Sequence, residues 1–173
     1  SKMSNAKKFS KGSEWRKWDL HVHTPYSMVQ GFTGATIDDR WENFITDLES
    51  LPEEFKVIGI NDYLFIDGYK KVLEYRSAGR LNNIETILPV IEFRVKKFAG
   101  HKDFKRINFH VIFSDEIDPS IIENQFLNSL TSKYHLTPGL DGIQWNGVVN
   151  KDSLADLGRA IKSSVSAEQL ENY

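Results

Sequence analysis

The stretch "WRKWDLHVHT" (residues 15–24) decides the fold and the chemistry that this sequence predicts. It reads as a β-strand that runs into a loop rich in Pro, Gly, Ser and Thr over residues 24–35. His21 and His23 lie two positions apart, so on a strand their side chains point to the same face. Two imidazoles at the end of a strand can bind one metal ion or a close pair of ions. Taken alone, however, paired histidines on a strand are ordinary surface residues as often as they are metal ligands.

Helix and strand patterns alternate along the rest of the chain. Strands are predicted over residues 15–23, 55–60, 86–95 and 106–113. Helices are predicted to begin after the cap Thr36, at Asp67 (ending at Gly79), at Asp118-Pro119, and at Asp152 or Ser153. The resulting order is strand, helix, strand, helix, strand, strand, helix, helix. This order is typical of the α/β class, with parallel strands in the first half.

Length and composition bound the function. The 173 residues suit one domain, expected over residues 15–173 after a flexible tail at 1–14. A net charge of −2 means that any nucleic-acid binding must use a local patch. The absence of cysteine excludes disulfides, cysteine zinc sites and thiol nucleophiles, and it fits the cytoplasm. Neither a membrane helix nor a signal peptide is predicted, so no membrane partner is expected.

Three polar residues are placed in or directly after apolar strand segments. Asp62 follows "VIGIN", Glu92 stands inside "PVIEFRV", and His110 stands inside "INFHVIF". Each is costly to bury without a partner. One such residue is readily explained by an outward side chain or a local hydrogen bond. Three of them, each on a strand segment, predict convergence on a common site with the paired histidines.

The link between Glu92 and His110 is too short for a crossover helix, and it therefore predicts an antiparallel hairpin. If the tip falls near Gly100-His101, Glu92 lies opposite His110 and the two can share a metal ion.

Basic residues gather on this hairpin: Lys96, Lys97, His101, Lys102, Lys105 and Arg106. They form either a solvated loop or a contact for a phosphate backbone. Arg94, on the same strand face as Glu92, is a candidate phosphate clamp, with a structural ion pair as the alternative. The four tryptophans are expected in the core or at an interface.

Four motifs taken in order, "WDLHVHTPYS", "GINDY", "PVIEFRV" and "FHVIFSDE", resemble those of the PHP (polymerase and histidinol phosphatase) superfamily. The resemblance covers about residues 15–130. The short hairpin is similar to the polymerase-associated branch. The segment "GINDYLFIDGYKKVLEYR" resembles PHP domains fused to large SMC-like or AAA-like ATPases of bacteria, some of them phage-defence proteins.

The resemblance implies a distorted (β/α)7 TIM-like barrel, expected to be incomplete in this chain, with up to three zinc, manganese or iron ions. It implies a metal-dependent phosphoesterase that hydrolyses phosphate esters of nucleic acids or nucleotides with a metal-activated water. Its implied metal ligands are His21, His23, Glu92 and His110, with Asp62 as a partial substitute. Glu92, Arg94 and Asp62 are the candidate catalytic residues.

Two departures from the PHP pattern support an alternative function. The second motif usually ends in Asp-His, but here it reads Asp62-Tyr63, and the final Asp-x-His motif is absent. The sequence around His135 is too generic to assign His135 to a motif that would replace the missing one. The alternative is a degenerate PHP domain that serves as an interaction or regulatory module of a fused ATPase. The substrate, the metal and the oligomeric state stay open.

Overall fold

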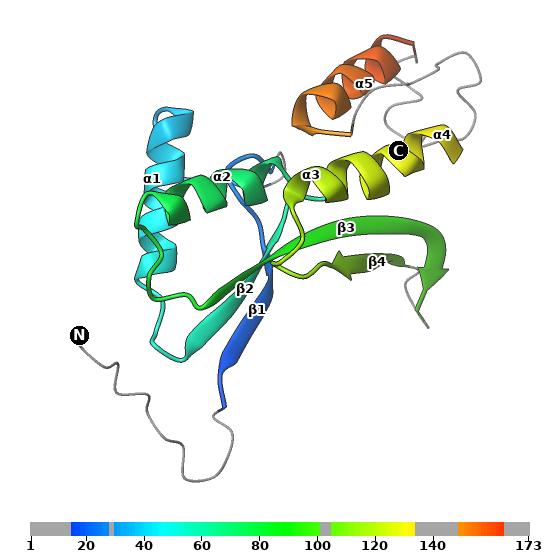
Figure 1. The fold of residues 1–173 in the computed structure, drawn as a ribbon. Helices are drawn as coiled ribbons and strands as arrows, with labels where there is room; N and C mark the ends of the chain where they lie inside the picture. The colour runs from blue at the N-terminus through cyan, green and yellow to red at the C-terminus, as the bar shows by residue number, and fades with distance from the viewer. Residues whose placement is uncertain (1–14, 28–29, 101–104, 134–148, 165–173) are drawn as a thin grey trace.

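The computed structural model describes residues 15–27, 30–100, 105–133 and 149–164. Its elements, shown in Figure 1, are β1 (Lys17–Val22), α1 (Ile37–Glu49), β2 (Phe55–Asn61), α2 (Asp67–Ser77), β3 (Thr86–Ala99), β4 (Lys105–Ile112), α3 (Pro119–Ile121), the π-helical turn η1 (Ile122–Leu127), α4 (Asn128–Lys133) and α5 (Lys151–Ser164). The predicted α/β class and the alternation of elements up to β3 are confirmed.

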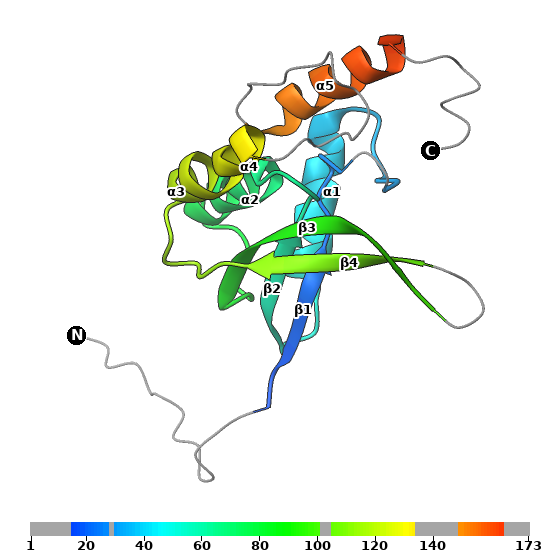
Figure 2. The same cartoon turned by 90° about the vertical axis from the view of Figure 1, so that its right-hand side faces the viewer.

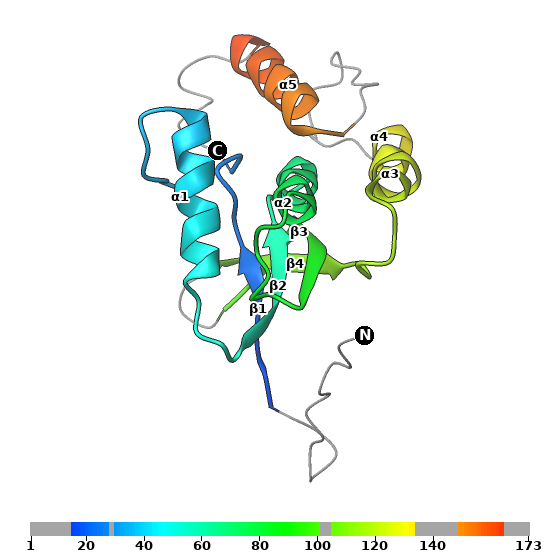
Figure 3. The same cartoon turned by 60° about the vertical axis from the view of Figure 1, so that its left-hand side comes forward.

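The strands form one mixed sheet in the order β1-β2-β3-β4. β1, β2 and β3 run parallel, as predicted, and β4 returns antiparallel to β3. Helices α1, α2 and α3 lie above the sheet in Figure 3, and α5 lies further out over this helical layer. The opposite face of the sheet carries no helix among the described residues.

The predicted (β/α)7 barrel is wrong. The described part of the chain contributes four strands to an open, curved sheet, and β1 and β4 form its two edges. The alternation of strand and helix stops at β3, because the next strand returns directly through a hairpin. A barrel closes only when every strand has a partner on both sides, and four strands of this curvature leave two edges open.

The core lies between the sheet and the helices. Ile58, Ile60 and Ile91 project from the sheet into a buried cluster with Trp41 and Tyr69. Each such side chain contributes about 1.5–3 kcal/mol through removal from water. Trp41 therefore confirms the expectation for a tryptophan in the core. Trp15 and Trp18 do not, since 98% and 63% of their surfaces are exposed.

Helix boundaries follow the predicted caps in part. The Thr36 hydroxyl accepts from the Asp39 N–H and the Asp39 carboxylate accepts from the Thr36 N–H, which is a full capping box. α2 ends just before Gly79, whose φ of +88° suits a glycine. Asp67 is the first residue of α2 and does not cap it. None of the helices in the described part of the chain has the length and apolar character needed to cross a bilayer.

The β3–β4 hairpin confirms the predicted register, with Glu92 directly opposite His110. Both strands continue beyond this pair to Phe98↔Arg106 and Ala99↔Lys105, after a bulge that follows Arg94. Figure 2 shows the two strands extending together as a ribbon beyond the helices. The tip at 101–104 lies outside the described residues.

Candidate metal centre

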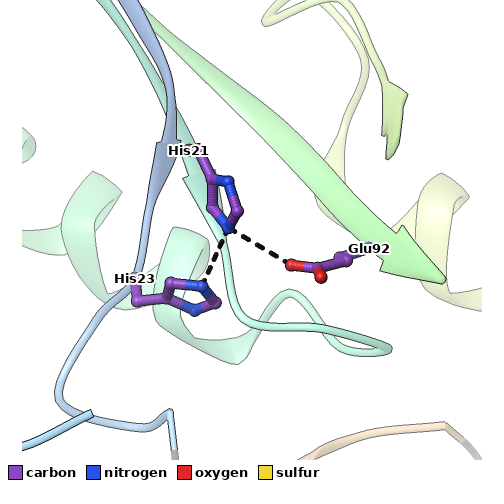
Figure 4. A group of neighbouring side chains, drawn as sticks. All are labelled: His21, His23 and Glu92. Atoms are coloured by element: carbon purple, nitrogen blue, oxygen red, sulfur yellow. Dashed lines mark hydrogen bonds and ion pairs between the residues drawn. The ribbon is translucent and has the colours of Figure 1, made fainter. Parts of the chain in front are cut away.

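His21 and His23, at the end of β1, meet Glu92, which reaches them from β3 on the far side of β2 (Figure 4). The Nε2 atoms of His21 and His23 are 3.1 Å apart, and His21 Nε2 is 3.3 Å from Glu92 Oε2. The three candidate ligand atoms all lie within 4.8 Å of one another. Glu92 is buried, while the His21 side chain is 48% exposed, so the group opens to solvent on the side of His21.

The two measured spacings suit a shared metal ion. Two ligand atoms that each lie about 2.05 Å from one tetrahedral ion are about 3.3 Å apart. Two neutral imidazoles and one carboxylate are also a donor set that zinc, manganese and iron accept. The group of His21, His23 and Glu92 can therefore hold a metal ion.

His110 lies at the edge of this group. Its Nε2 is 3.5 Å from Glu92 Oε2, and its ring centroid is 4.8 Å from that of His21. The Nε2 atom is buried and has no hydrogen-bond partner, which is unusual for a buried polar atom. The predicted convergence of His110 with Glu92 and His21 is confirmed, although His110 is not part of the compact group of three.

Two asparagines that the sequence interpretation missed hold the Glu92 carboxylate. Asn61 Nδ2 donates to Oε2 at 3.0 Å, and Asn108 Nδ2 donates to Oε1 at 2.5 Å. Such partners orient a ligand. Asn108 could have been found from its position two residues before His110, which places both on the same strand face. Asn61 could have been found as the last residue of an apolar strand.

The structure places Asp62 behind the centre, and the carboxylate is not part of the ligand group. Its Oδ1 accepts from the Thr24 N–H at 2.8 Å, and its Oδ2 accepts from the Thr24 hydroxyl at 2.5 Å. Burial raises the pKa of Asp62 to about 6, although both bonds from Thr24 oppose the rise. Because Thr24 follows His23, Asp62 fixes the main chain that carries this histidine.

His23 is held in its neutral form. Burial lowers its pKa, and the neighbouring His21 and His110 lower it further, while Glu92 acts in the opposite direction. Only the neutral imidazole binds a metal ion, so this environment favours ligation.

Tyr63 lies against the centre in a strained main-chain conformation. Its φ is +64°, which costs a bulky residue about 1–2 kcal/mol. Its carbonyl accepts from the Glu92 N–H at 3.0 Å, and its ring centroid is 5.0 Å from that of His23. The tyrosine thus touches one ligand with its ring and holds another with its carbonyl.

The other predicted site residues lie further out. Arg94 is exposed on β3, two residues beyond Glu92, and makes no ion pair with another described residue. Lys105 is exposed at the start of β4. His135, His101 and Lys102 lie outside the described residues.

Comparison of the chain with protein-family models, with curated proteins and with solved structures gave no match. The candidate function therefore rests on the residues of the centre.

Proposed function

We propose that this chain is a metal-dependent phosphoesterase whose centre is formed by His21, His23 and Glu92, with His110 beside it. The observation that carries the proposal is the group of three ligand atoms within 4.8 Å of one another, with His21 and His23 at the end of β1 and Glu92 on β3. Catalytic zinc sites keep three protein ligands and leave a position open, whereas structural sites are closed by four. The exposure of His21 supports an open position.

A bound zinc, manganese or iron ion would lower the pKa of a water molecule and polarise a phosphoryl oxygen. The chain supplies the geometry for this chemistry. Asn61 and Asn108 fix both oxygens of Glu92, and the bond from Glu92 N–H to the Tyr63 carbonyl fixes its main chain. The exposed Arg94 guanidinium, on the same strand face as Glu92, can pair with a non-bridging phosphate oxygen.

The PHP resemblance of the four motifs supports the same activity. A second function, a degenerate domain that regulates a fused ATPase, is favoured by one observation. Tyr63 stands where that pattern has a histidine, and its ring lies against His23. A phenol is a weaker metal ligand than an imidazole, so the centre is expected to bind about one ion tightly.

The test is hydrolysis of bis(p-nitrophenyl) phosphate by the full chain with added Mn²⁺, Zn²⁺ or Fe²⁺, together with metal content by mass spectrometry. Glu92→Gln should reduce turnover at least about 100-fold and lower bound metal, because it removes a charged ligand whose partners stay in place. The matched control, Glu53→Gln, removes an exposed carboxylate before β2 and should behave like the parent. Bound metal without hydrolysis would favour the regulatory function.

A further inference from the structure

The ribbon formed by β3 and β4 beyond the metal centre is strongly basic. Its described strand segments, residues 94–99 and 105–106, hold five cationic residues and no acidic one: Arg94, Lys96, Lys97, Lys105 and Arg106. These segments therefore carry a charge of +5 in a chain whose net charge is −2, so the other residues together carry −7. The ribbon thus carries a net positive charge, whereas the rest of the chain carries a net negative one.

This ribbon is a direct continuation of the centre. Arg94 pairs across the strands with Asn108, and the next pair on the same face is Glu92 with His110. Asn108 itself donates to Glu92. Residues two apart on a strand are separated by about 6.6–6.8 Å, close to the spacing between successive phosphates of an extended nucleic-acid strand. An anionic strand that follows the ribbon thus reaches the ligand group.

Charges that are not neutralised within the protein are available to a ligand. Arg94 and Lys105 are both exposed, and neither forms an ion pair with another described residue. By contrast, several basic residues elsewhere are paired, as in Lys70–Glu123 and Lys71–Glu74. β4 also exposes Phe109 and Ile107, with 56% and 43% of their surfaces accessible. By the register of the two strands, Phe109 lies on the strand face opposite to Arg94 and Asn108, so binding of a nucleic-acid strand beside the centre rests on the cationic residues.

We propose, building on the phosphoesterase function above, that the β3–β4 ribbon binds the sugar-phosphate backbone of a single-stranded nucleic acid and leads one of its phosphodiesters to the metal centre. A mononucleotide would contact only a few of the ribbon's cationic residues, so its binding would not require the ribbon. The substrate class is therefore a polynucleotide, and the ribbon is its positioning surface.

The test measures binding apart from chemistry. A fluorescent 20-nucleotide single strand is titrated with the full chain in EDTA between 50 and 200 mM NaCl, and its anisotropy is followed. The triple variant Lys97→Gln, Lys105→Gln, Arg106→Gln removes three ribbon charges. Its binding should weaken at least about 10-fold at 100 mM salt, and the slope of log K against log salt should decrease by about 2.

The matched control removes the same charge from helices instead. Lys71→Gln, Arg159→Gln, Lys162→Gln changes α2 and α5, and it should bind the strand like the parent. Equal weakening by both triple variants would overturn the proposal, as would equally tight binding of polyglutamate by the parent. Circular dichroism of both variants checks that the fold persists.

Hydrolysis then separates the two proposals. The ribbon variant should cleave bis(p-nitrophenyl) phosphate at the parental rate and the oligonucleotide at least about 10-fold more slowly. Ribbon-dependent binding with no hydrolysis of either ester would count against the phosphoesterase alone. Parental cleavage of the oligonucleotide by the ribbon variant would overturn the ribbon as positioning surface.

Discussion

The buried carboxylate of Asp62 depends on one neighbour, Thr24, for its hydrogen bonds. Only 1% of the residue is exposed, and both oxygens accept from Thr24. These bonds recover part of the cost of removing the carboxylate from water, yet its pKa still rises to about 6. Thr24 follows His23, so the arrangement links the stability of the fold to the placement of a ligand.

This raised pKa predicts a pH dependence of stability. The folded chain binds the Asp62 proton more tightly than the unfolded chain, whose carboxyl titrates near 3.8. The contribution of Asp62 to the free energy of unfolding should therefore fall by about 3 kcal/mol in total as pH rises from well below the unfolded pKa to well above the folded one, and about 2 kcal/mol of this fall should occur between about pH 4 and about pH 6. Asp62→Asn keeps an oxygen that can accept from the Thr24 N–H, places an amide group that can donate to the Thr24 hydroxyl oxygen, and removes the titration.

Urea unfolding in EDTA at pH 4, 5, 6 and 7 measures this effect as the difference between parent and Asp62→Asn. Asp47→Asn, an exposed change on α1, serves as the control and should follow the parent. A difference between parent and Asp62→Asn that stays constant across the four pH values would contradict the prediction.

Side-chain chemistry explains which site residues the sequence revealed. His21, His23, Glu92 and His110 were predictable because charged or imidazole groups in apolar strands need a partner. Asn61 and Asn108 carry no charge, so burying them does not demand a charged partner, and only their positions on the strands could have indicated them. Tyr63 was read as a replaced ligand, whereas its φ of +64° and its carbonyl bond to Glu92 depend on a loop shape that only the structure shows.

At the scale of elements, the start of α2 packs over the Asp62–Thr24 pair through Gly68. A Cβ at this position would lie 1.8 Å from Asp62 Oδ2 and 2.4 Å from Thr24 Oγ1. The helix can approach the pair this closely only because residue 68 has no side chain. The packing of α2 is thus coupled to the chain segment that carries His23.

Gly68→Ala should accordingly destabilise the fold by about 2–3 kcal/mol, because overpacking outweighs the gain in helix propensity of about 1 kcal/mol. Gly158→Ala in α5 is the matched control, since no atom lies within 4 Å of its added methyl. It should stabilise the chain by up to about 1 kcal/mol. Thermal and urea unfolding of both variants decide the matter, and a Gly68→Ala chain as stable as the parent would disprove the packing argument.

The structure of the β3–β4 hairpin could be predicted from the sequence more fully than that of the segment after Asp118. A short link fixes the register of an antiparallel pair, so the opposition of Glu92 and His110 followed from counting residues. The helix that begins at Pro119 instead turns π-helical at Ile122. Ile121 is 46% exposed, and Ile122 is buried. Helical spacing of 3.6 residues cannot anticipate a π-helical turn.

At the scale of the whole molecule, the expected barrel and the observed sheet have the same local arrangement of strands and helices. Parallel β1, β2 and β3 with helices on one face are common to both, and the pattern of apolar segments predicts them. Closure depends on strand number and on pairing between distant edges, which a local pattern does not encode. The sequence therefore predicted the elements and the proximity of His21, Glu92 and His110 correctly, and the closed barrel incorrectly.

The position of the centre couples metal binding to global stability. Its ligands come from β1, from the loop after it and from β3, so unfolding of the sheet separates them. An ion that binds the folded chain alone raises the free energy of unfolding by about 2.7 kcal/mol at a free concentration of 100 times its Kd. We expect Mn²⁺ or Zn²⁺ to raise the melting temperature of the parent in proportion to the logarithm of its concentration.

The double variant His21→Ala, His23→Ala should lose this response. It should otherwise unfold much like the parent in EDTA, because the side chain of His21 is half exposed and the core is formed by other residues. The control, Glu53→Gln, should keep the full rise. Differential scanning calorimetry over a metal series measures all three chains, and an unchanged rise in the double variant would place the bound ion elsewhere. A rise lost in the double variant and kept in the control would instead tie the bound ion to the site at the end of β1.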